Sequence, residues 1–182
     1  MKLQNGAKQR LPRAETSTMN DIYIQLAEDN DLETVIQLTL ASFAQVSFES
    51  NIQADFGLIN GLSWKERKAD HIRGDFGDPD GRVLLAKRDG QTIGFVSIRL
   101  NRTTKIGVIA NLAVSASARN EGVGRMLIQS SIELMRDESM ELARIETLEQ
   151  NEVGQSLYPK LGFHELARQI YYCQDLRDGN QR

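Results

Sequence analysis

The sequence predicts an α/β (α+β) fold, a single domain with a mixed, mostly antiparallel sheet of about seven strands flanked by helices. Three strand-like segments follow one another over 83–87, 92–100 and 105–114, and Asp89-Gly90 between the first two is a hairpin signal. A helical pattern and another strand come next, and this order predicts a parallel pair with a right-handed crossover. With 182 residues and 40% hydrophobic residues, the chain suits one well-buried domain and is short for two.

The segments before these strands supply a first strand and a first helix. Residues 21–27 alternate apolar and polar side chains, which is typical of a strand. Asn30 or Asp31 can then cap a helix that continues through Phe43 with a regular apolar stripe.

Residues 44–81 show the least regular pattern in the chain. A helix is expected over about 63–71, and 74–81 is rich in turn residues and is expected to form a loop. We expect Trp64 to pack beneath this long connection and His71 to lie on a helix surface.

The remainder of the chain alternates helices and strands. Its long helix has a strongly apolar side, and Gly162 is expected to cap the end of a shorter helix. The expected elements are a helix over 122–138, a strand over 142–148, a short helix from Asn151 or Glu152 to Leu161, and closing strands over 163–166 and 169–174.

Composition excludes several classes of protein. The formal net charge of −3, from 22 basic and 25 acidic residues, argues against a general nucleic-acid binder. No apolar run reaches the roughly 18 residues of a membrane-spanning helix. The one cysteine, Cys173, cannot form an internal disulfide; it fits a cytoplasmic protein and is expected to be a small core residue in a late strand.

Both ends of the chain differ from its patterned middle. Residues 1–18 are polar and lack periodicity, so we expect a disordered leader or an expression remnant. The domain is expected over 19–176, and 177–182 is expected to be frayed.

The strand over 106–114 is the expected centre of function. Its apolar side chains alternate onto both faces, as in a buried central strand. One face is expected to hold Ile106, Val108, Leu112 and Val114, and the other Ile109 and Ala113.

The loop after this strand predicts an anion site. Gly122 and Gly124 open the next helix, where glycine costs roughly 0.5–1 kcal/mol relative to alanine. Their small size lets an anion approach the unpaired N–H groups and the positive dipole end of the first helical turn. Arg119 and Arg125 add forked, charged donors that suit a pyrophosphate.

The motif Arg119-Asn-Glu-Gly-Val-Gly124 resembles the acetyl-CoA signature Gln/Arg-x-x-Gly-x-Gly/Ala of the GCN5-related N-acetyltransferases (GNAT). Further matches at that family's usual spacing are Asn111-Leu-Ala-Val114, Ile145-Glu-Thr147 with Asn151, and Leu157-Tyr-Pro-Lys-Leu-Gly-Phe163. The resemblance implies that the fourth and fifth strands form a parallel pair that splays to admit the pantetheine arm of acetyl-CoA. It also implies, by analogy alone, a homodimer.

By the same resemblance, backbone groups of the fourth strand pair with pantetheine and offer an N–H to the thioester oxygen, while the glycine loop holds the pyrophosphate. Asn151 contacts the pantetheine arm. Tyr158 protonates the departing thiolate, and its position after Leu157 is expected to point it away from the core. The implied binding residues are Leu112, Ala113, Val114, Arg119, Asn120, Glu121, Gly122, Val123, Gly124, Arg125, Asn151 and Tyr158.

The general base departs from the family pattern. Many members carry a glutamate near the end of the fourth strand, where this chain has Ala110 and Asn111. We favour Glu146, because its spacing to Tyr158 resembles that of bacterial acetyltransferases acting on the N-terminal alanine of a ribosomal protein; a solvated surface position is its alternative. A charged amine would lose its proton to Glu146 through water or bind to it first. Weaker candidates are Glu149 and Glu49.

The leading hypothesis is an acetyl-CoA-dependent N-acetyltransferase that uses no metal and transfers the acetyl group directly to a primary amine in a ternary complex. Protein N-termini, lysines and small amines all remain open as acceptors. A non-catalytic acyl-CoA sensor is the alternative, and retention of Tyr158 argues against it. A dinucleotide-binding protein is a third hypothesis, although its glycine loop would follow the first strand of a βαβ series.

Overall fold

The computed structural model describes residues 22–177, and the predictions made for 1–18 and for the last residues of the chain lie outside this range. The sheet has five strands in the order β1-β2-β3-β4-β5. All neighbours are antiparallel except β4 and β5, which are parallel, so the predicted mixed sheet is confirmed. The strands are β1 (Tyr23–Leu26), β2 (Gly81–Arg88), β3 (Gln91–Asn101), β4 (Ile106–Val114) and β5 (Leu142–Ile145).

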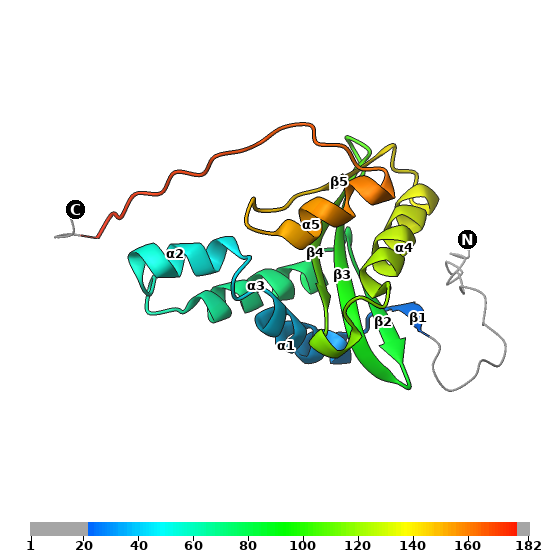
Figure 1. Cartoon of the computed structure of the whole chain (residues 1–182), viewed down its shortest axis with the longest axis horizontal. Helices are drawn as coiled ribbons and strands as arrows, with labels where there is room; N and C mark the ends of the chain where they lie inside the picture. The colour runs from blue at the N-terminus through cyan, green and yellow to red at the C-terminus, as the bar shows by residue number, and fades with distance from the viewer. Residues whose placement is uncertain (1–21, 178–182) are drawn as a thin grey trace, which may run out of the picture.

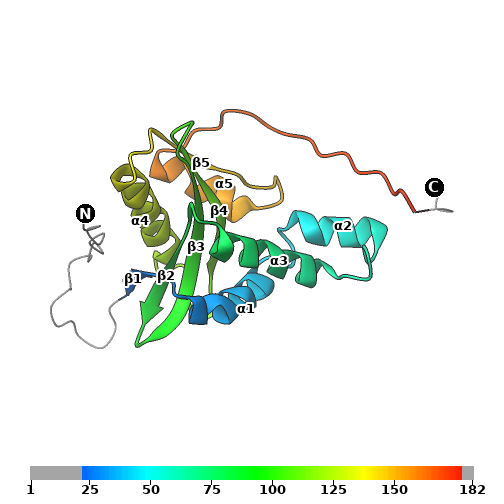
Figure 2. The ribbon, with the colours of Figure 1, turned by 180° about the vertical axis from the view of Figure 1, so that it is seen from behind.

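Helices cover both faces of this sheet (Figures 1 and 2). Helices α1 and α3 pack on one face, where their apolar residues meet Val83, Leu85 and Phe95. Helix α4 packs on the other face against residues such as Leu84 and Val96, which alternate with the first set along the strands. The helices are α1 (Leu32–Ser42), α2 (Phe48–Phe56), α3 (Trp64–Gly77), α4 (Val123–Asp137) and α5 (Glu152–Leu157).

Strand β4 contains a bulge that overturns one prediction. Ser97 of β3 pairs with Asn111 and the next residue, Ile98, pairs with Ile109, so Ala110 is an extra residue in β4. One extra residue inverts the alternation of side chains beyond it. Ile109 therefore lies with Leu112 and Val114 on the α4 side, and Ala113 lies on the opposite side.

The region predicted to be least regular contains more helix than expected. Helix α2 has no counterpart in the prediction, and α3 continues through 74–77, which was assigned to a loop. Ser63 starts α3 with a reciprocal capping box to Glu66. The helix persists past Gly74 because Ile72 and Asp75 are buried beneath it, and this packing outweighs the low helix propensity of glycine.

The closing strands predicted over 163–166 and 169–174 are absent from the sheet, which is why it has five strands among the described residues. After the short turn Pro159–Leu161, Gly162 adopts φ +88°, as its predicted capping role requires. The following segment contains no helix or strand and runs away from the sheet toward α2 (Figure 1). Without a neighbouring strand its backbone groups cannot form a ladder, and Cys173 is exposed rather than in the core.

Candidate functional site

The site begins where β4 and β5 part. Their parallel pairing runs from Ile106 opposite Leu142 to Ile109 opposite Ile145, and β5 ends there. Strand β4 continues through Val114, paired with β3 alone in the described part of the chain. The bulge at Ala110 lies at the point of separation, so the backbone of 110–114 forms a free edge within the molecule.

The glycine loop lies at the end of this free edge. Gly122 is the N-cap of α4 with φ +84°, and no side chain caps the helix there. A Cβ on Gly122 would meet nothing within 4 Å, and one on Gly124 would lie 3.7 Å from Leu157 and 3.8 Å from Val114. The amides of the first helical turn, which have no partner inside the helix, therefore face open space beside β4 and α5.

The charges around the loop are arranged favourably for an anion. Arg88 of β2 forms an ion pair with Glu121, which neutralises the one acidic group of the motif. Arg119 and Arg125 are exposed, and neither forms an ion pair within the described residues. Two exposed guanidinium groups thus flank the positive end of the α4 dipole in the sequence.

A polar cluster lies between the end of β5 and the start of α5. Asn151 caps α5 by accepting a hydrogen bond from the N–H of Gly154 at 3.2 Å, and its amide donates to Thr147 Oγ1 at 2.9 Å. A Cβ on Gly154 would lie 2.8 Å from Asn151, 3.0 Å from Thr147 and 3.1 Å from Tyr158. Glycine is required there for close approach, and sequence reasoning missed it although a glycine within a short helix was the available signal.

Tyr158 is half-buried, and its orientation differs from the prediction. The ring packs on the α4-side core and lies edge-on to Phe163, with ring centroids 6.4 Å apart, rather than pointing away from the core. Burial raises the pKa of the Tyr158 hydroxyl, and a hydrogen bond with Thr147 partly offsets that rise. The phenol is therefore a proton donor at neutral pH.

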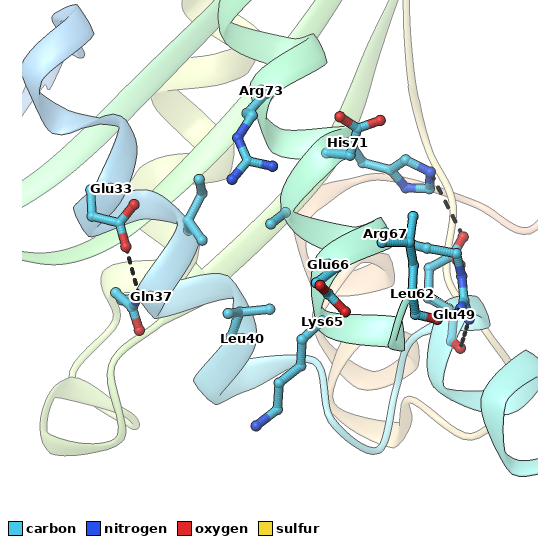
Figure 3. A pocket seen from close by; sticks show the side chains of 13 residues that line it. Glu33, Gln37, Leu40, Glu49, Leu62, Lys65, Glu66, Arg67, His71 and Arg73 are labelled. Atoms are coloured by element: carbon cyan, nitrogen blue, oxygen red, sulfur yellow. Dashed lines mark hydrogen bonds and ion pairs between the residues drawn. The ribbon is translucent and has the colours of Figure 1, made fainter. Parts of the chain in front are cut away.

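The three candidate bases lie in different surroundings. Glu146 directly follows β5; its side chain is 63% exposed and bonds Arg144 at 2.9 Å. Glu149 is 86% exposed and pairs with Arg168. Glu49 is 12% exposed and is held by Arg67 at 2.7 Å, with His71 Nε2 at 3.7 Å (Figure 3).

A buried polar network lies beneath the bulge, and the sequence analysis did not identify it. Asp75 of α3 accepts hydrogen bonds from Ser97 at 2.6 Å and from the amide of Asn111 at 2.7 Å. Arg99 bonds the second carboxylate oxygen at 2.8 and 2.5 Å. Lys68 donates to Asn111 Oδ1 at 2.6 Å, so residues from α3, β3 and β4 are joined.

Lys68 itself is half-buried beside this network. Its ammonium lies 4.4 Å from the centroid of the Phe43 ring, a cation–π contact. Burial lowers the pKa of Lys68; the charge of Arg99 adds to the fall, and the charges of Asp75 and Glu49 oppose it. A cation is thus held next to the bulged part of β4.

A groove with a volume of about 780 Å³ lies elsewhere, along α1 and α3 (Figure 3). It is lined by Glu33, Glu49, Arg67 and His71 among others, and by none of the predicted acetyl-CoA residues.

Among residues 22–177 no group of three or more His, Cys, Asp or Glu side chains could hold a metal ion. No helix in the same range is long and apolar enough to cross a membrane.

Comparisons with known proteins agree on one family. The model of the acetyltransferase (GNAT) family matches residues 47–163. A mycothiol acetyltransferase of Thermomonospora curvata is 33% identical over 95 residues, which are 52% of this chain and 31% of that protein. An uncharacterized N-acetyltransferase of Archaeoglobus fulgidus is 31% identical over 105 residues, covering 55% and 62% of the two chains. The chain spans about a third of the length of the mycothiol acetyltransferases that it matches.

Solved structures show the same fold at low identity. The aminoglycoside N-acetyltransferase AAC(6')-Iy in complex with CoA aligns with a TM-score of 0.64 and 17% identity, covering 90% of this chain and 98% of that one. A ribosomal-protein-alanine N-acetyltransferase from Brucella melitensis aligns with a TM-score of 0.57 and 21% identity, covering 87% and 100%.

Proposed function

We propose an activity from one premise: the chain belongs to the acetyltransferase (GNAT) family, whose model matches residues 47–163. The proposed reaction is transfer of an acetyl group from acetyl-CoA to a primary amine. The observation that carries it is the open glycine loop at the start of α4, placed beside the free edge of β4.

Acetyl-CoA fits this arrangement in two parts. The pyrophosphate would bind the amides of 121–125 and the guanidinium groups of Arg119 and Arg125, where no side chain fills the space at Gly122. The pantetheine arm would lie along the free edge of Leu112–Val114, in the opening left where β5 ends. Asn151, which caps α5, would contact the pantetheine arm there, and a structural neighbour of this fold was solved with CoA.

Two side chains would carry the proton transfers. The acceptor nitrogen attacks the thioester carbonyl, the C–N bond forms, and the C–S bond breaks. Tyr158 would give its phenolic proton to the departing thiolate, for which its raised pKa keeps it protonated. Glu146 would take the proton released by the amine through water, since its carboxylate is exposed at the end of β5.

Lys68 would favour the reactive form of the acceptor. A positive charge lowers the pKa of a nearby ammonium group. Lys68 donates a hydrogen bond to Asn111 at the bulge, next to the proposed thioester position. Its charge would lower the pKa of an acceptor amine bound there, so that more of the amine is neutral. We leave the acceptor as a primary amine on a peptide, a lysine or a small molecule, because the relatives are named for several different acceptors.

The proposal is tested by isothermal titration with acetyl-CoA and CoA, followed by measurement of thiol release over a panel of amines and N-terminal peptides. Micromolar or tighter binding with thiol release for one acceptor class is the expected result. Binding without release for any acceptor would favour the acyl-CoA sensor. An absence of CoA binding would overturn the proposed role of the glycine loop.

Gly124→Val is expected to weaken CoA binding by at least about tenfold while leaving the fold intact, because a branched side chain would stand in front of the first-turn amides. The nearest atom to an added Cβ is 3.7 Å away, an ordinary van der Waals contact. Isothermal titration measures the change. Gly74→Val on α3, where nothing lies within 4 Å of the added Cβ, is the control and should bind CoA normally.

A further inference from the structure

Asp75 is a buried carboxylate that the proposed acetyl transfer does not use. Its side chain is 1% exposed, although taking a charge out of water costs free energy and replacing a buried ion pair by apolar groups is often neutral for stability. Buried polar groups of this kind can specify one conformation among several. The conformation at issue here is that of β4, because Asp75 bonds Asn111, the residue that directly follows the bulge at Ala110.

Every hydrogen-bonding group of the Asn111 amide has a partner. Its nitrogen donates to Asp75 Oδ2 at 2.7 Å and to the Ser97 hydroxyl oxygen at 3.2 Å, which uses both N–H groups. Its oxygen accepts from Lys68 Nζ at 2.6 Å. Turning the amide over would place its oxygen against the Asp75 carboxylate and its nitrogen against the Lys68 ammonium. The partners therefore allow one orientation of this side chain.

The backbone at Asn111 depends on these side-chain contacts more than the first half of β4 does. At a bulge the extra residue is left out of the hydrogen-bond ladder. Beyond Ile109 the strand has also lost β5 as its neighbour, so that among the described residues only β3 pairs with it there. The buried Asn111 side chain ties this stretch to Ser97 on β3 and to Asp75 on α3.

We propose that Asn111 is a positioning residue for acetyl transfer: held by Asp75, it fixes the bulge and with it the free edge over 112–114 that would receive the pantetheine arm. The inference rests on the proposed function, and it gives the departure from the family's glutamate a role. A carboxylate at 111 would face Asp75 and could not donate to it. The reaction is sensitive to this placement, because misplacing a reacting group by about 1 Å can cost about 100-fold in rate.

The test exchanges the two side chains in the full chain. Asn111→Asp alone sets two carboxylates against each other and is expected to lower kcat for thiol release by about 10- to 100-fold. Adding Asp75→Asn restores an amide–carboxylate pair with the roles reversed, and the double variant should recover kcat to within about fivefold of the natural protein. The Kd for CoA should stay within a few fold throughout, because the pyrophosphate would bind at the glycine loop.

The double variant separates positioning from the charge of Lys68. The carboxylate introduced by Asn111→Asp would also pair with Lys68, in the single and the double variant alike. A kcat that stays low in the double variant would therefore assign the loss to the charge of Lys68 and overturn the proposal, as would an unchanged kcat in Asn111→Asp. Thr39→Ala, which removes a buried hydroxyl from α1, is the control for stability, and its kcat per folded molecule should equal that of the natural protein.

A second readout does not depend on activity. Amide hydrogen exchange of the peptide that covers 110–114, measured by mass spectrometry without ligands, should be at least about tenfold faster in Asn111→Asp and slow again in the double variant, while exchange in α4 stays constant. If the natural protein releases no thiol but this pattern is seen, the proposed function fails and Asn111 still fixes the edge. Unchanged exchange in Asn111→Asp, with thiol release by the natural protein, would overturn this inference alone.

Discussion

Tyr158→Phe is expected to lower kcat by about 100- to 10,000-fold, the usual contribution of a positioned general acid. The substitution removes one hydroxyl from a ring that packs on the α4-side core, so folding should be unaffected. Because the hydroxyl acts on the departing thiolate, the loss should appear in kcat while the Kd for CoA stays within a few fold. Thiol release at saturating substrates and isothermal titration measure the two quantities.

Tyr23→Phe, on the exposed first strand, is the matched control and should keep full activity. The pH profile gives a second check. Burial raises the pKa of Tyr158 above the ordinary tyrosine value of 10.0, so the acid stays protonated and kcat should not decline on its account below that pH. An unchanged kcat in Tyr158→Phe would assign the thiolate proton to another donor.

Asp75→Ala is expected to lower the free energy of unfolding by about 2–4 kcal/mol, because two buried hydrogen-bond donors lose their acceptor, while Arg99 is 51% exposed and can be hydrated. The Asp75 side chain is 1% exposed and accepts hydrogen bonds from Ser97, Asn111 and Arg99. Its removal leaves the Ser97 hydroxyl and the Asn111 amide buried without this acceptor. Urea unfolding followed by circular dichroism measures the change.

Asp70→Ala is the control for this experiment, since Asp70 is an exposed aspartate on the same helix. It should change the free energy of unfolding by no more than about 0.5 kcal/mol. A loss below about 1 kcal/mol in Asp75→Ala, comparable to one ordinary hydrogen bond, would show that the network beneath the bulge does not stabilise the fold as a unit.

The sequence was most informative where a pattern is local and repeated. Helix α4 was predicted over 122–138 and occupies Val123–Asp137, because its apolar stripe and opening glycines are visible in a short window. The strands β2, β3 and β4 were predicted in order for the same reason. Asn151 and Tyr158 both lie close to Gly154, at the two ends of the short helix α5. Their chemical roles remain predictions.

Features that depend on distant residues were not predictable in this way. The bulge at Ala110 depends on how β4 pairs with β3, and no residue type in β4 predicts it. Asp75 was assigned to a loop because glycines surround it, although its partners lie on β3 and β4. Residues 163–177 show part of the alternation of a strand, but alternation cannot say whether a partner strand is present in the same chain.

The bulge in β4 also determines which side chains of the strand face α4. Before it, odd-numbered residues such as Gly107 and Ile109 face α4, and a Cβ on Gly107 would lie 2.6 Å from the sulfur of Met135. After it, the even-numbered Leu112 and Val114 face α4. A regular strand that kept Ala110 without the bulge would therefore shift the alternation by one residue: Ala110 would take the place opposite Ser97, and Asn111 would turn into the apolar layer under α4. Sequence exchange between this chain and its relatives must preserve that one-residue offset, even where every side chain around it changes.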